Sequence, residues 1–255
     1  MIVHEVAPGV VQLDLAGADP DQLADVEALR ARLAAGIEGG WRRIQVHHAP
    51  EDARTHRLAA RLGLRREGVL RGLGPRHGDV VVMARLADDP GPETREGFLG
   101  VLNTTMPTKR NIAQALLRDP QGRVLLCELT YKREWDLPGG IVDPGEPPST
   151  TAEREVTEEL GIDLQVGDLL AVDWLPPYRG WSDATLFVFD GGDHDPDELQ
   201  RRITVQPREI RAVHWATPRE VAEHCAPYVV TLLNHLAATP RGRGTAYLID
   251  GRPRP

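Results

Sequence analysis

Apolar and polar positions alternate with different periods along the chain, and each period predicts one kind of element. Residues Val10 to Leu15 alternate as a half-buried strand does. Apolar residues then recur at helical spacing from Leu23 to Ile37, and a glycine pair ends that run. The other elements predicted before residue 87 are a strand over Arg42 to His47, a helix over Glu51 to Leu62, and strands near Gly68 to Arg71 and Asp79 to Leu86.

The periodic pattern breaks between Ala87 and Lys109. The stretch ADDPGPETREG combines proline, glycine and charge without apolar periodicity, which is typical of a linker. The chain of 255 residues is long enough for two domains of roughly 100–150 residues each. We therefore expect a first domain over residues 1–87, a linker over 88–108 and a second domain over 109–245.

Strands predominate after the break. A turn signal at residues 119–122 separates a strand over Ala113 to Leu117 from one over Arg123 to Leu129. A loop rich in glycine and proline precedes a helix from about Ser149 to Leu160. Further predicted elements are strands near Leu169 to Trp174, Ala184 to Asp190 and Arg211 to Trp215, and helices over Pro218 to His224 and Val229 to Ala237. This mixture predicts an α+β fold or an α/β/α sandwich.

Composition and charge narrow the range of partners. The net charge of −8 repels nucleic-acid backbones and anionic lipid, whereas a small phosphorylated substrate stays compatible because a metal ion can supply positive charge. No stretch approaches the ~20 apolar residues of a membrane span, and the start lacks the pattern of a signal peptide. The distant Cys127 and Cys225 favour two buried thiols over a disulfide or a zinc site. We expect a cytoplasmic protein without a nucleic-acid or membrane partner.

The helix predicted after residue 148 carries a cluster of like charges. Thr150 and Glu153 have the spacing of a capping box, which predicts the start of the helix. Glu155, Glu158 and Glu159 then lie at i, i+3 and i+4 on one face, where they repel one another. A hard divalent cation would neutralise such a cluster, because magnesium prefers carboxylate oxygens. The pattern therefore favours a metal site over an ordinary solvated helix face.

The segment from Gly139 to Ile162 resembles the Nudix box, whose pattern is G-x5-E-x7-R-E-U-x-E-E-x-G-U with U apolar. The seven fixed positions are filled by Gly140, Glu146, Arg154, Glu155, Glu158, Glu159 and Gly161. Val156 and Ile162 stand at apolar positions of the pattern. Seven fixed matches arise by chance with a frequency on the order of 10⁻⁸ per window, so coincidence is negligible.

This resemblance implies a fold, a reaction and a set of site residues. It covers about Lys109 to Ala238 and implies a Nudix α/β/α sandwich that hydrolyses a nucleoside diphosphate linked to another moiety, by water attack at phosphorus. Carried over residue by residue, Glu155, Glu158 and Glu159 ligate Mg²⁺, with Mn²⁺ as the alternative, or assist the attacking water. The resemblance leaves open which glutamate is the base.

Other residues of the segment have supporting roles by the same resemblance. The Gly139 carbonyl is a candidate metal ligand, and Glu146 and Arg154 orient the helix and its carboxylates. Nudix domains often use a further carboxylate outside the box. Glu209, before the predicted strand at residues 211–215, is the candidate here, against the alternative of a surface glutamate.

The substrate beyond the diphosphate stays open. Trp135, Tyr178 and Trp181 are candidates to stack a base, with packing in the core or at the rim as the alternative for each. Pro177 and Tyr178 lie where different Nudix groups carry a proline or a tyrosine, so they point to no single substrate.

The amino-terminal stretch HHAPEDARTHRLAARLGLRREGVLRG…GDVVVMARL resembles the carboxy-terminal half of a GNAT-type N-acetyltransferase, over roughly Val10 to Leu86. The family's first half is missing. The loop that should cradle the coenzyme A pyrophosphate reads AGADPDQLADVEAL, without a glycine pair. Its Asp19, Asp21 and Asp25 would repel phosphate. We expect a half-GNAT-like α/β domain that does not transfer acetyl groups.

Two other classes of function are compatible with parts of the sequence. An acetyltransferase acting through the amino-terminal half is disfavoured by the damaged loop, and a nucleotide-sensing regulatory protein is disfavoured by the complete set of glutamates. A half GNAT fold of about four strands leaves one edge strand without a partner. We therefore expect a homodimer that uses this domain, with a compact monomer as the alternative.

Overall fold

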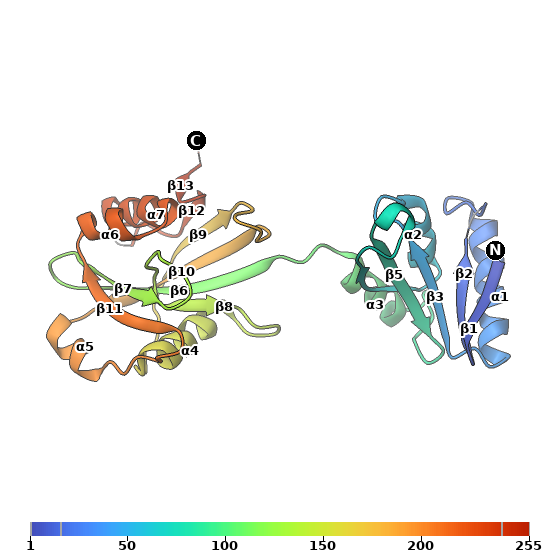
Figure 1. The fold of residues 1–255 in the computed structure, drawn as a ribbon, viewed down its shortest axis with the longest axis horizontal. Coiled ribbons are helices and arrows are strands. Elements are labelled where there is room, and N and C mark those ends of the chain that lie inside the picture. Colours follow the sequence, from blue (N-terminus) through green and yellow to red (C-terminus); the bar gives the residue numbers. More distant parts are fainter. Residues whose placement is uncertain (1, 16, 241, 255) are drawn as a thin grey trace. The chain divides into compact units, whose positions relative to one another are not determined.

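The computed structural model describes residues 2–15, 17–240 and 242–254. It divides into two compact units, residues 1–107 and 108–255, and Figure 1 shows the elements of each. Among the described residues no helix is long and apolar enough to cross a membrane.

The amino-terminal unit is a five-stranded sheet with three α-helices. The strands run in the order β1-β2-β3-β5-β4, with β2 and β3 parallel and the other neighbours antiparallel. The elements are β1 (Ile2–Ala7), β2 (Val10–Asp14), α1 (Leu23–Glu38), β3 (Arg43–His48), α2 (Ala53–Arg61), β4 (Arg65–Leu70), β5 (Val80–Leu86) and α3 (Arg95–Thr105). Strand β1 adds a fifth strand to the four expected from the sequence.

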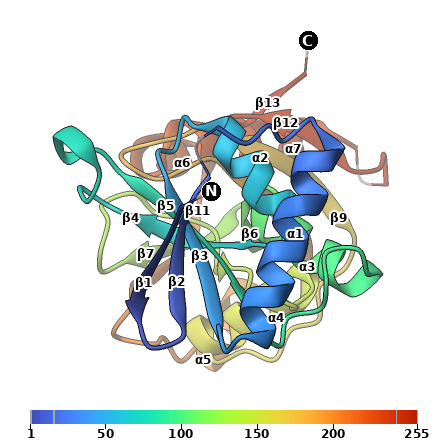
Figure 2. The same cartoon turned by 90° about the vertical axis from the view of Figure 1, so that its right-hand side faces the viewer.

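Helices α1 and α2 lie side by side on one face of this sheet, as Figure 2 shows. Their apolar stripes, with Leu33 and Leu58 fully buried, pack on Ile44 and Met83 of the strands. The Arg30 guanidinium donates to the Arg61 carbonyl at the end of α2, which ties the two helices together. Among the described residues this face carries the apolar core cluster of the unit, where helical and strand periods meet.

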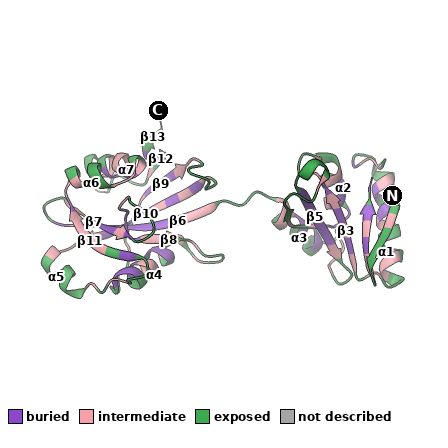
Figure 3. Cartoon of the chain, viewed as in Figure 1, coloured by how far each residue is buried: buried purple, intermediate pink, exposed green. Residues whose placement is uncertain are grey.

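Helix α3 occupies the stretch that the sequence analysis assigned to a linker over residues 88–108. Thr94 caps its first turn by accepting from the Gly97 N–H at 3.1 Å. The helix lies along β4, where the Thr104 hydroxyl accepts from the Arg66 N–H at 3.1 Å. Because α3 buries few side chains, its sequence lacks the apolar stripe that marks a helix. Its position covers the β4 edge, whereas the side chains of β1 at the other edge are almost all exposed (Figure 3).

The carboxy-terminal unit is built on a larger sheet. Its strands run in the order β11-β7-β6-β10-β9-β12-β13, and β8 pairs with β6. The elements are β6 (Arg110–Arg118), β7 (Val124–Leu129), β8 (Gly139–Ile141), α4 (Pro148–Leu160), β9 (Leu169–Leu175), β10 (Ala184–Asp193), α5 (Pro196–Arg202), β11 (Ile210–Ala216), α6 (Pro218–His224), α7 (Pro227–Ala238), β12 (Ala246–Ile249) and β13 (Arg252–Pro253). The sheet therefore continues past residue 245, where the sequence analysis ended the domain.

Helices cover both faces of this sheet. Val156 and Leu160 of α4 and Leu199 of α5 pack in one apolar cluster with β6, β7 and β11. Val221 of α6 and Leu232 of α7 belong to a second cluster on the opposite face. Figure 1 shows these helix pairs on opposite sides of the strands. The arrangement is an α+β fold in three layers, and it holds one end of α4 against β6 and β8.

A buried carboxylate anchors the strands at the far end of the chain. Asp173 of β9 is fully buried, and its Oδ2 accepts from the Gly251 N–H at 2.9 Å. Asp250 and Gly251, with φ of 53° and 75°, form the two-residue turn between β12 and β13. Burial raises the pKa of Asp173 to about 6, although the Gly251 hydrogen bond acts in the opposite direction.

Candidate active site

The site begins where β8 lies beside β6. Gly139 has a φ of 143°, and a Cβ atom there would lie 2.6 Å from Gln114 Cα on β6. At Gly140 a Cβ atom would lie 2.5 Å from the Glu155 carboxylate carbon. Both positions therefore need glycine, the first for its backbone conformation and its contact with β6, the second to leave space for a carboxylate.

Helix α4 starts differently from the sequence prediction. Pro148 is the first helical residue and Pro147 the cap, so neither Thr150 nor Glu153 forms the predicted capping box. Proline suits this first position because its fixed φ is already helical. The Glu153 carboxylate accepts instead from the Val166 N–H at 3.0 Å. The chain after α4 is thereby fastened to the helix.

Arg154 holds three glutamates of the motif. Its guanidinium donates to both oxygens of Glu146, at 3.0 and 3.1 Å, in a two-pronged geometry. It also donates to Glu155 at 3.0 Å and to Glu158 at 3.3 Å. The bonds from Arg154, with one from the Thr151 hydroxyl, lower the pKa of Glu146 to about 2. Glu146 therefore stays ionised over the usual pH range and holds the Arg154 guanidinium in place.

Glu159 is the buried carboxylate of the site. Only 4% of the residue is exposed, and its Oε2 accepts from the Gly139 N–H at 2.9 Å. Burial raises the pKa of Glu159 to about 8, and the neighbouring carboxylates of Glu155, Glu209 and Asp136 add to the rise. A carboxyl group with such a pKa can both hold and release a proton near neutral pH.

The other acidic residues surround Glu159 at different depths. Burial raises the pKa of Glu155 against the opposing effect of Arg154, and the charges of Glu158 and Glu209 raise it further. The Glu158 side chain is 58% exposed. Glu209 is also exposed, on the turn before β11, yet its charge acts on Glu155 and Glu159. The charge of this glutamate from outside the motif therefore acts on two glutamates of α4.

The donor set suits a hard divalent cation. Carboxylate oxygens and a backbone carbonyl are the ligands that magnesium takes in proteins. Burial raises the pKa of Glu159 first, and the negative charges of Glu155, Glu209 and Asp136 add to the rise. Among the described residues no three His, Cys, Asp or Glu side chains lie close enough together to hold a metal ion as they stand. The reason is visible locally, because Arg154 draws Glu155 and Glu158 towards itself.

The loop of residues 130–138 contributes further polar side chains near Glu159, and the sequence did not predict them. Asp136 accepts from the Lys132 ammonium at 2.6 Å and from the Gln114 amide at 3.0 Å. Tyr131 of the same loop is 71% exposed. A lysine, an aspartate and a glutamine at irregular spacing carry no motif, so only the fold assembles them.

Trp135 in this loop cannot stack a base. Its indole ring lies between two imidazoles, with centroids 3.9 Å from His214 and 4.0 Å from His224. The interplanar angles of 2° and 14° mean that both faces are covered. The alternative of packing weighed for Trp135 is the correct one. Of the three aromatic candidates, Tyr178 and Trp181 stay exposed.

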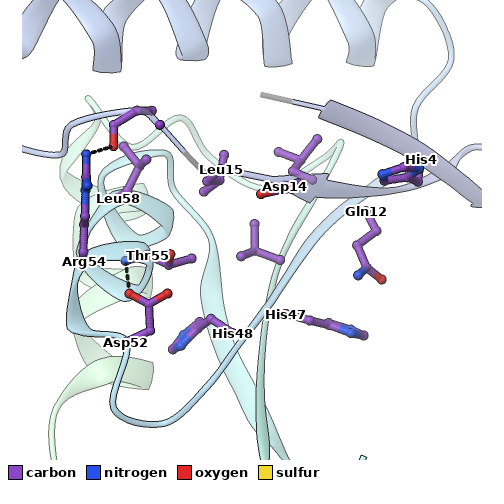
Figure 4. A pocket seen from close by; sticks show the side chains of 14 residues that line it. His4, Gln12, Asp14, Leu15, His47, His48, Asp52, Arg54, Thr55 and Leu58 are labelled. Carbon is purple, nitrogen blue, oxygen red and sulfur yellow. Dashed lines mark hydrogen bonds between the residues drawn. The ribbon is translucent and has the colours of Figure 1, made fainter. Parts of the chain in front are cut away.

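The amino-terminal unit contains a cavity of about 570 Å³. The pairing of β2 with β3 ends at Leu13 and Val46. The cavity lies beyond this point, and Asp14 and His47 are among the residues that line it. Figure 4 shows the polar side chains around it, including Asp52, which caps α2 by accepting from the Thr55 N–H. Its lining mixes acidic, imidazole and apolar groups, and Arg54 is bonded to the Ala18 carbonyl.

Comparisons with known proteins agree with the geometry of the carboxy-terminal unit. A NUDIX domain model matches residues 108–232. A MutT-like protein of Streptomyces ambofaciens is 34% identical over 131 residues, covering 49% of this chain and 75% of that protein. CTP pyrophosphohydrolase of Escherichia coli (strain K12) is 29% identical over 137 residues, covering 52% and 93%. The solved MutT protein from Methanosarcina mazei Go1 aligns with 25% identity and a TM-score of 0.44, over 51% of this chain and 96% of that one. With the glutamates of the motif gathered around Gly139 and with the match to the Streptomyces relative, the chain belongs to the Nudix family of hydrolases.

Proposed function

We propose that this protein hydrolyses a nucleoside diphosphate linked to another moiety, with magnesium as its cofactor and manganese as a substitute. The observation that carries the proposal is the buried Glu159 beside Glu155, held by the Gly139 N–H while Arg154 is fixed by Glu146. Carboxylates grouped in this way are suited to hold a magnesium ion, and that ion would neutralise the charge of a phosphate group during the reaction.

Each residue contributes a separate part of this chemistry. Glu155, Glu158 and Glu159, with the Gly139 carbonyl, would hold the magnesium, and Glu209 is the candidate for a further ligand. When bound, the cation neutralises phosphate charge and lowers the pKa of water near the phosphorus. Arg154 and Glu146 orient the carboxylates, because their ion pair sets the position of the helix face. A bound cation would lower the pKa that burial raises at Glu159, so the choice of base among the glutamates stays open.

A substrate panel tests the proposal directly. Phosphate or nucleotide release is measured with nucleoside triphosphates, nucleotide sugars and dinucleotides, each with magnesium, with manganese and with a chelator. We expect metal-dependent turnover of at least one compound at a rate typical of enzymes, on the order of 1–10³ s⁻¹. Turnover of none of them, in protein shown to be folded, would reject the reaction. The CTP pyrophosphohydrolase similarity places CTP in the panel.

We further propose that the amino-terminal unit is related to half of a GNAT fold and transfers no acetyl group. Its order of elements, a parallel β2–α1–β3 crossover followed by α2 and two antiparallel strands, supports this relation. The loop before α1 contains Asp19 and Asp21, whose charges oppose a pyrophosphate. Calorimetry with acetyl-CoA should show no saturable heat below millimolar ligand. A micromolar binding isotherm would contradict this part of the proposal.

The assembly we propose is a homodimer that uses the free edge of β1. Ile2 and Val6 are 58% and 53% exposed on this edge strand, and its outer backbone groups can pair with a second copy. Helix α3 lies along the β4 edge, so among the described strands of this unit β1 offers the edge for pairing. Light scattering at high micromolar concentration should give twice the chain mass of 28.1 kDa. The monomer mass would instead support the compact monomer.

A further inference from the structure

The cavity of the amino-terminal unit lies at the carboxyl ends of two parallel strands. Strands β2 and β3 are connected through α1 and pair only as far as Leu13 and Val46. The cavity of about 570 Å³ lies beyond this point. Ligands of α/β sheets bind outside the carboxyl ends of the strands, and pockets of about 300–1,000 Å³ hold small molecules. Position and volume therefore both favour a binding site for a small molecule.

Aliphatic side chains form part of the cavity lining. Leu13 and Leu15 come from β2 and the residue that follows it, Val46 from β3 and Leu58 from α2. Each of the four is almost completely buried in the core of the unit. A ligand with a short hydrocarbon chain would cover the apolar surface that they present to the cavity.

Two carboxylates line the same cavity. Asp14 lies at the end of β2, and Asp52 caps α2 by accepting from the Thr55 N–H at 3.0 Å. Figure 4 shows the two on different sides of the cavity. The hydrogen bonds from Thr55 lower the pKa of Asp52, so this carboxyl group is ionised at neutral pH. A carboxylate has about four lone-pair sites, so Asp52 can accept from a ligand while it caps the helix.

The basic side chains of the lining offset this negative charge only in part. The Arg54 guanidinium donates to the Ala18 carbonyl at 2.8 Å, and the residue is exposed. Burial is the main cause that lowers the pKa of His47, which leaves its imidazole neutral near pH 7. The cavity therefore favours a cationic ligand over an anionic one.

An organic cation suits this lining better than a metal ion does. Within the part of the chain that the structure describes, no group of three His, Cys, Asp or Glu side chains could hold a metal ion. An ammonium group needs a single carboxylate, to which it donates one of its three hydrogen bonds. Two carboxylates on different sides of a partly apolar cavity therefore match a hydrocarbon chain with an ammonium group at each end.

We propose that this cavity binds a small aliphatic diamine. One ammonium group donates to Asp52 and the other donates to Asp14. The hydrocarbon chain between them packs on Leu13, Val46 and Leu58. Because the site belongs to the amino-terminal unit, binding needs neither the hydrolysis nor a metal ion, and the two proposals stand or fall separately.

The first test measures the affinity of the full chain for 1,4-diaminobutane by calorimetry. Wild type is compared with Asp52→Asn, Asp14→Asn and the control Asp88→Asn, at an exposed position of the same unit. Asparagine caps a helix about as well as aspartate, so Asp52→Asn keeps the start of α2 and removes the charge.

Wild type should show saturable binding below millimolar diamine. Asp52→Asn and Asp14→Asn should each weaken it about tenfold or more, because a hydrogen bond between two charged groups is lost. Asp88→Asn should bind as wild type does. Wild type without saturable heat, or equal affinities in wild type and both lining variants, would overturn the site.

The second test varies the ligand. Butylamine has one ammonium group and should bind about tenfold more weakly than the diamine, whereas 1,4-butanediol has none and should give no saturable heat. Butanediol that binds as tightly as the diamine would show that the carboxylates are not used. A capped glycyl-lysyl-glycine tripeptide presents a similar ammonium group on a peptide, and tighter binding of this peptide than of the diamine would overturn the assignment to a small molecule.

The third test locates the diamine, because the glutamates of α4 are also acidic. Glu158→Gln removes a charge from α4 and should leave the affinity for 1,4-diaminobutane unchanged. The imidazole resonances of His47, recorded by NMR, should shift as the diamine saturates, whereas those of His214 in the other unit should not. A loss of affinity in Glu158→Gln, with His47 unaffected by the diamine, would place the ligand on α4 and reject the cavity.

Discussion

The two units of the chain differ in where they keep charge. Among the described residues of the amino-terminal unit, the buried polar group is His48. In the carboxy-terminal unit the buried polar groups include four carboxylates, on Asp119, Asp136, Glu159 and Asp173. Burying a carboxylate costs free energy unless partners compensate it. Of the four, Glu159 belongs to the Nudix motif, whereas Asp173 holds the turn before β13 and Asp119 holds the turn between β6 and β7. The buried charge of this unit therefore serves packing as well as the candidate site.

The same contrast exists within the motif. Glu146 and Glu159 are fixed glutamates of one sequence pattern, yet the pKa of Glu146 is lowered to about 2 and that of Glu159 is raised to about 8. Arg154 and Thr151 surround the first, whereas the second is buried with the Gly139 N–H as its hydrogen-bond donor. Two carboxyl groups whose environments separate their pKa values in this way are suited to different tasks.

The largest expected effect comes from removing the charge of one carboxylate near the end of α4. Glu159→Gln and Glu158→Gln should each lower kcat about 10²-fold or more, because a metal ligand or a proton acceptor is lost. The matched control in the amino-terminal unit is Glu96→Gln, at an exposed position of α3, which should leave kcat unchanged. Steady-state rates on a substrate found in the panel are the measurement. Full activity in both site variants, with the fold retained, would remove the catalytic assignment.

A smaller effect is expected from a methyl group placed beside a carboxylate. Gly140→Ala puts a Cβ atom 2.5 Å from the Glu155 carboxylate carbon, so that side chain has to move while the backbone stays in place. We expect a loss of about tenfold in kcat with little change in stability, since a displaced ligand costs rate before it costs folding. Gly68→Ala on β4 is the control, because a Cβ atom there meets nothing within 4 Å. Equal activities of the two variants would show that the position of Glu155 does not limit the rate.

The third effect concerns stability and pH in the carboxy-terminal unit. Burial raises the pKa of Asp173 to about 6. The contribution of Asp173 to the free energy of unfolding is therefore fully present below pH 4 and is lost as the pH rises through 6. Asp173→Asn keeps an oxygen for the Gly251 N–H and removes the charge. From pH 4 to 7 the variant should gain on the order of 2–3 kcal/mol relative to wild type. Urea unfolding of both proteins at the two pH values measures this difference, and a constant gap would contradict the raised pKa.

The smallest effect is the opposite pH dependence of the amino-terminal unit. Glu67 pairs with Arg43 at 2.5 Å, and the hydrogen bond from Arg43 lowers its pKa. This contribution is present above the ordinary pKa of a glutamate and is lost as the pH falls. Because the Glu67 side chain is 42% exposed, Glu67→Gln should cost about 0.2–1 kcal/mol at pH 7 and nothing at pH 3. The same urea experiment gives the answer, and a cost that grows towards acid would refute it.

Local patterns predicted much of the fold, because many elements show one clear period. Helix α1 and the strands β7, β9 and β10 lie where apolar spacing indicated them. The pattern missed β1, whose side chains are mostly exposed, and α3, whose contacts with β4 are partly polar. It also misplaced the capping box at Thr150, because Pro148 already starts the helix. An element is visible in a sequence to the extent that it buries an apolar face.

The site was predictable where residues follow one another at fixed spacing. The glutamates from Glu146 to Glu159 lie on one loop and one helix, so a linear pattern describes them. The Trp135 stack was not predictable, since its imidazoles come from β11 and from the end of α6. Asp136 likewise links Lys132 of its own loop to Gln114 of the distant strand β6. Contacts between distant segments depend on the tertiary fold, which spacing does not encode.

The pairing of distant strands has a consequence for the time course of folding. Gln12 and Gln45, which join β2 to β3, are 33 residues apart, whereas Glu128 and His214, which join β7 to β11, are 86 residues apart. Closing the longer loop costs only about 1 kcal/mol more, but folding rates fall as contacts become less local. The carboxy-terminal unit should therefore acquire its structure after the amino-terminal one. During that interval the strands that later bury Glu159 are open to solvent and to each other, which makes this unit the more vulnerable to aggregation on refolding.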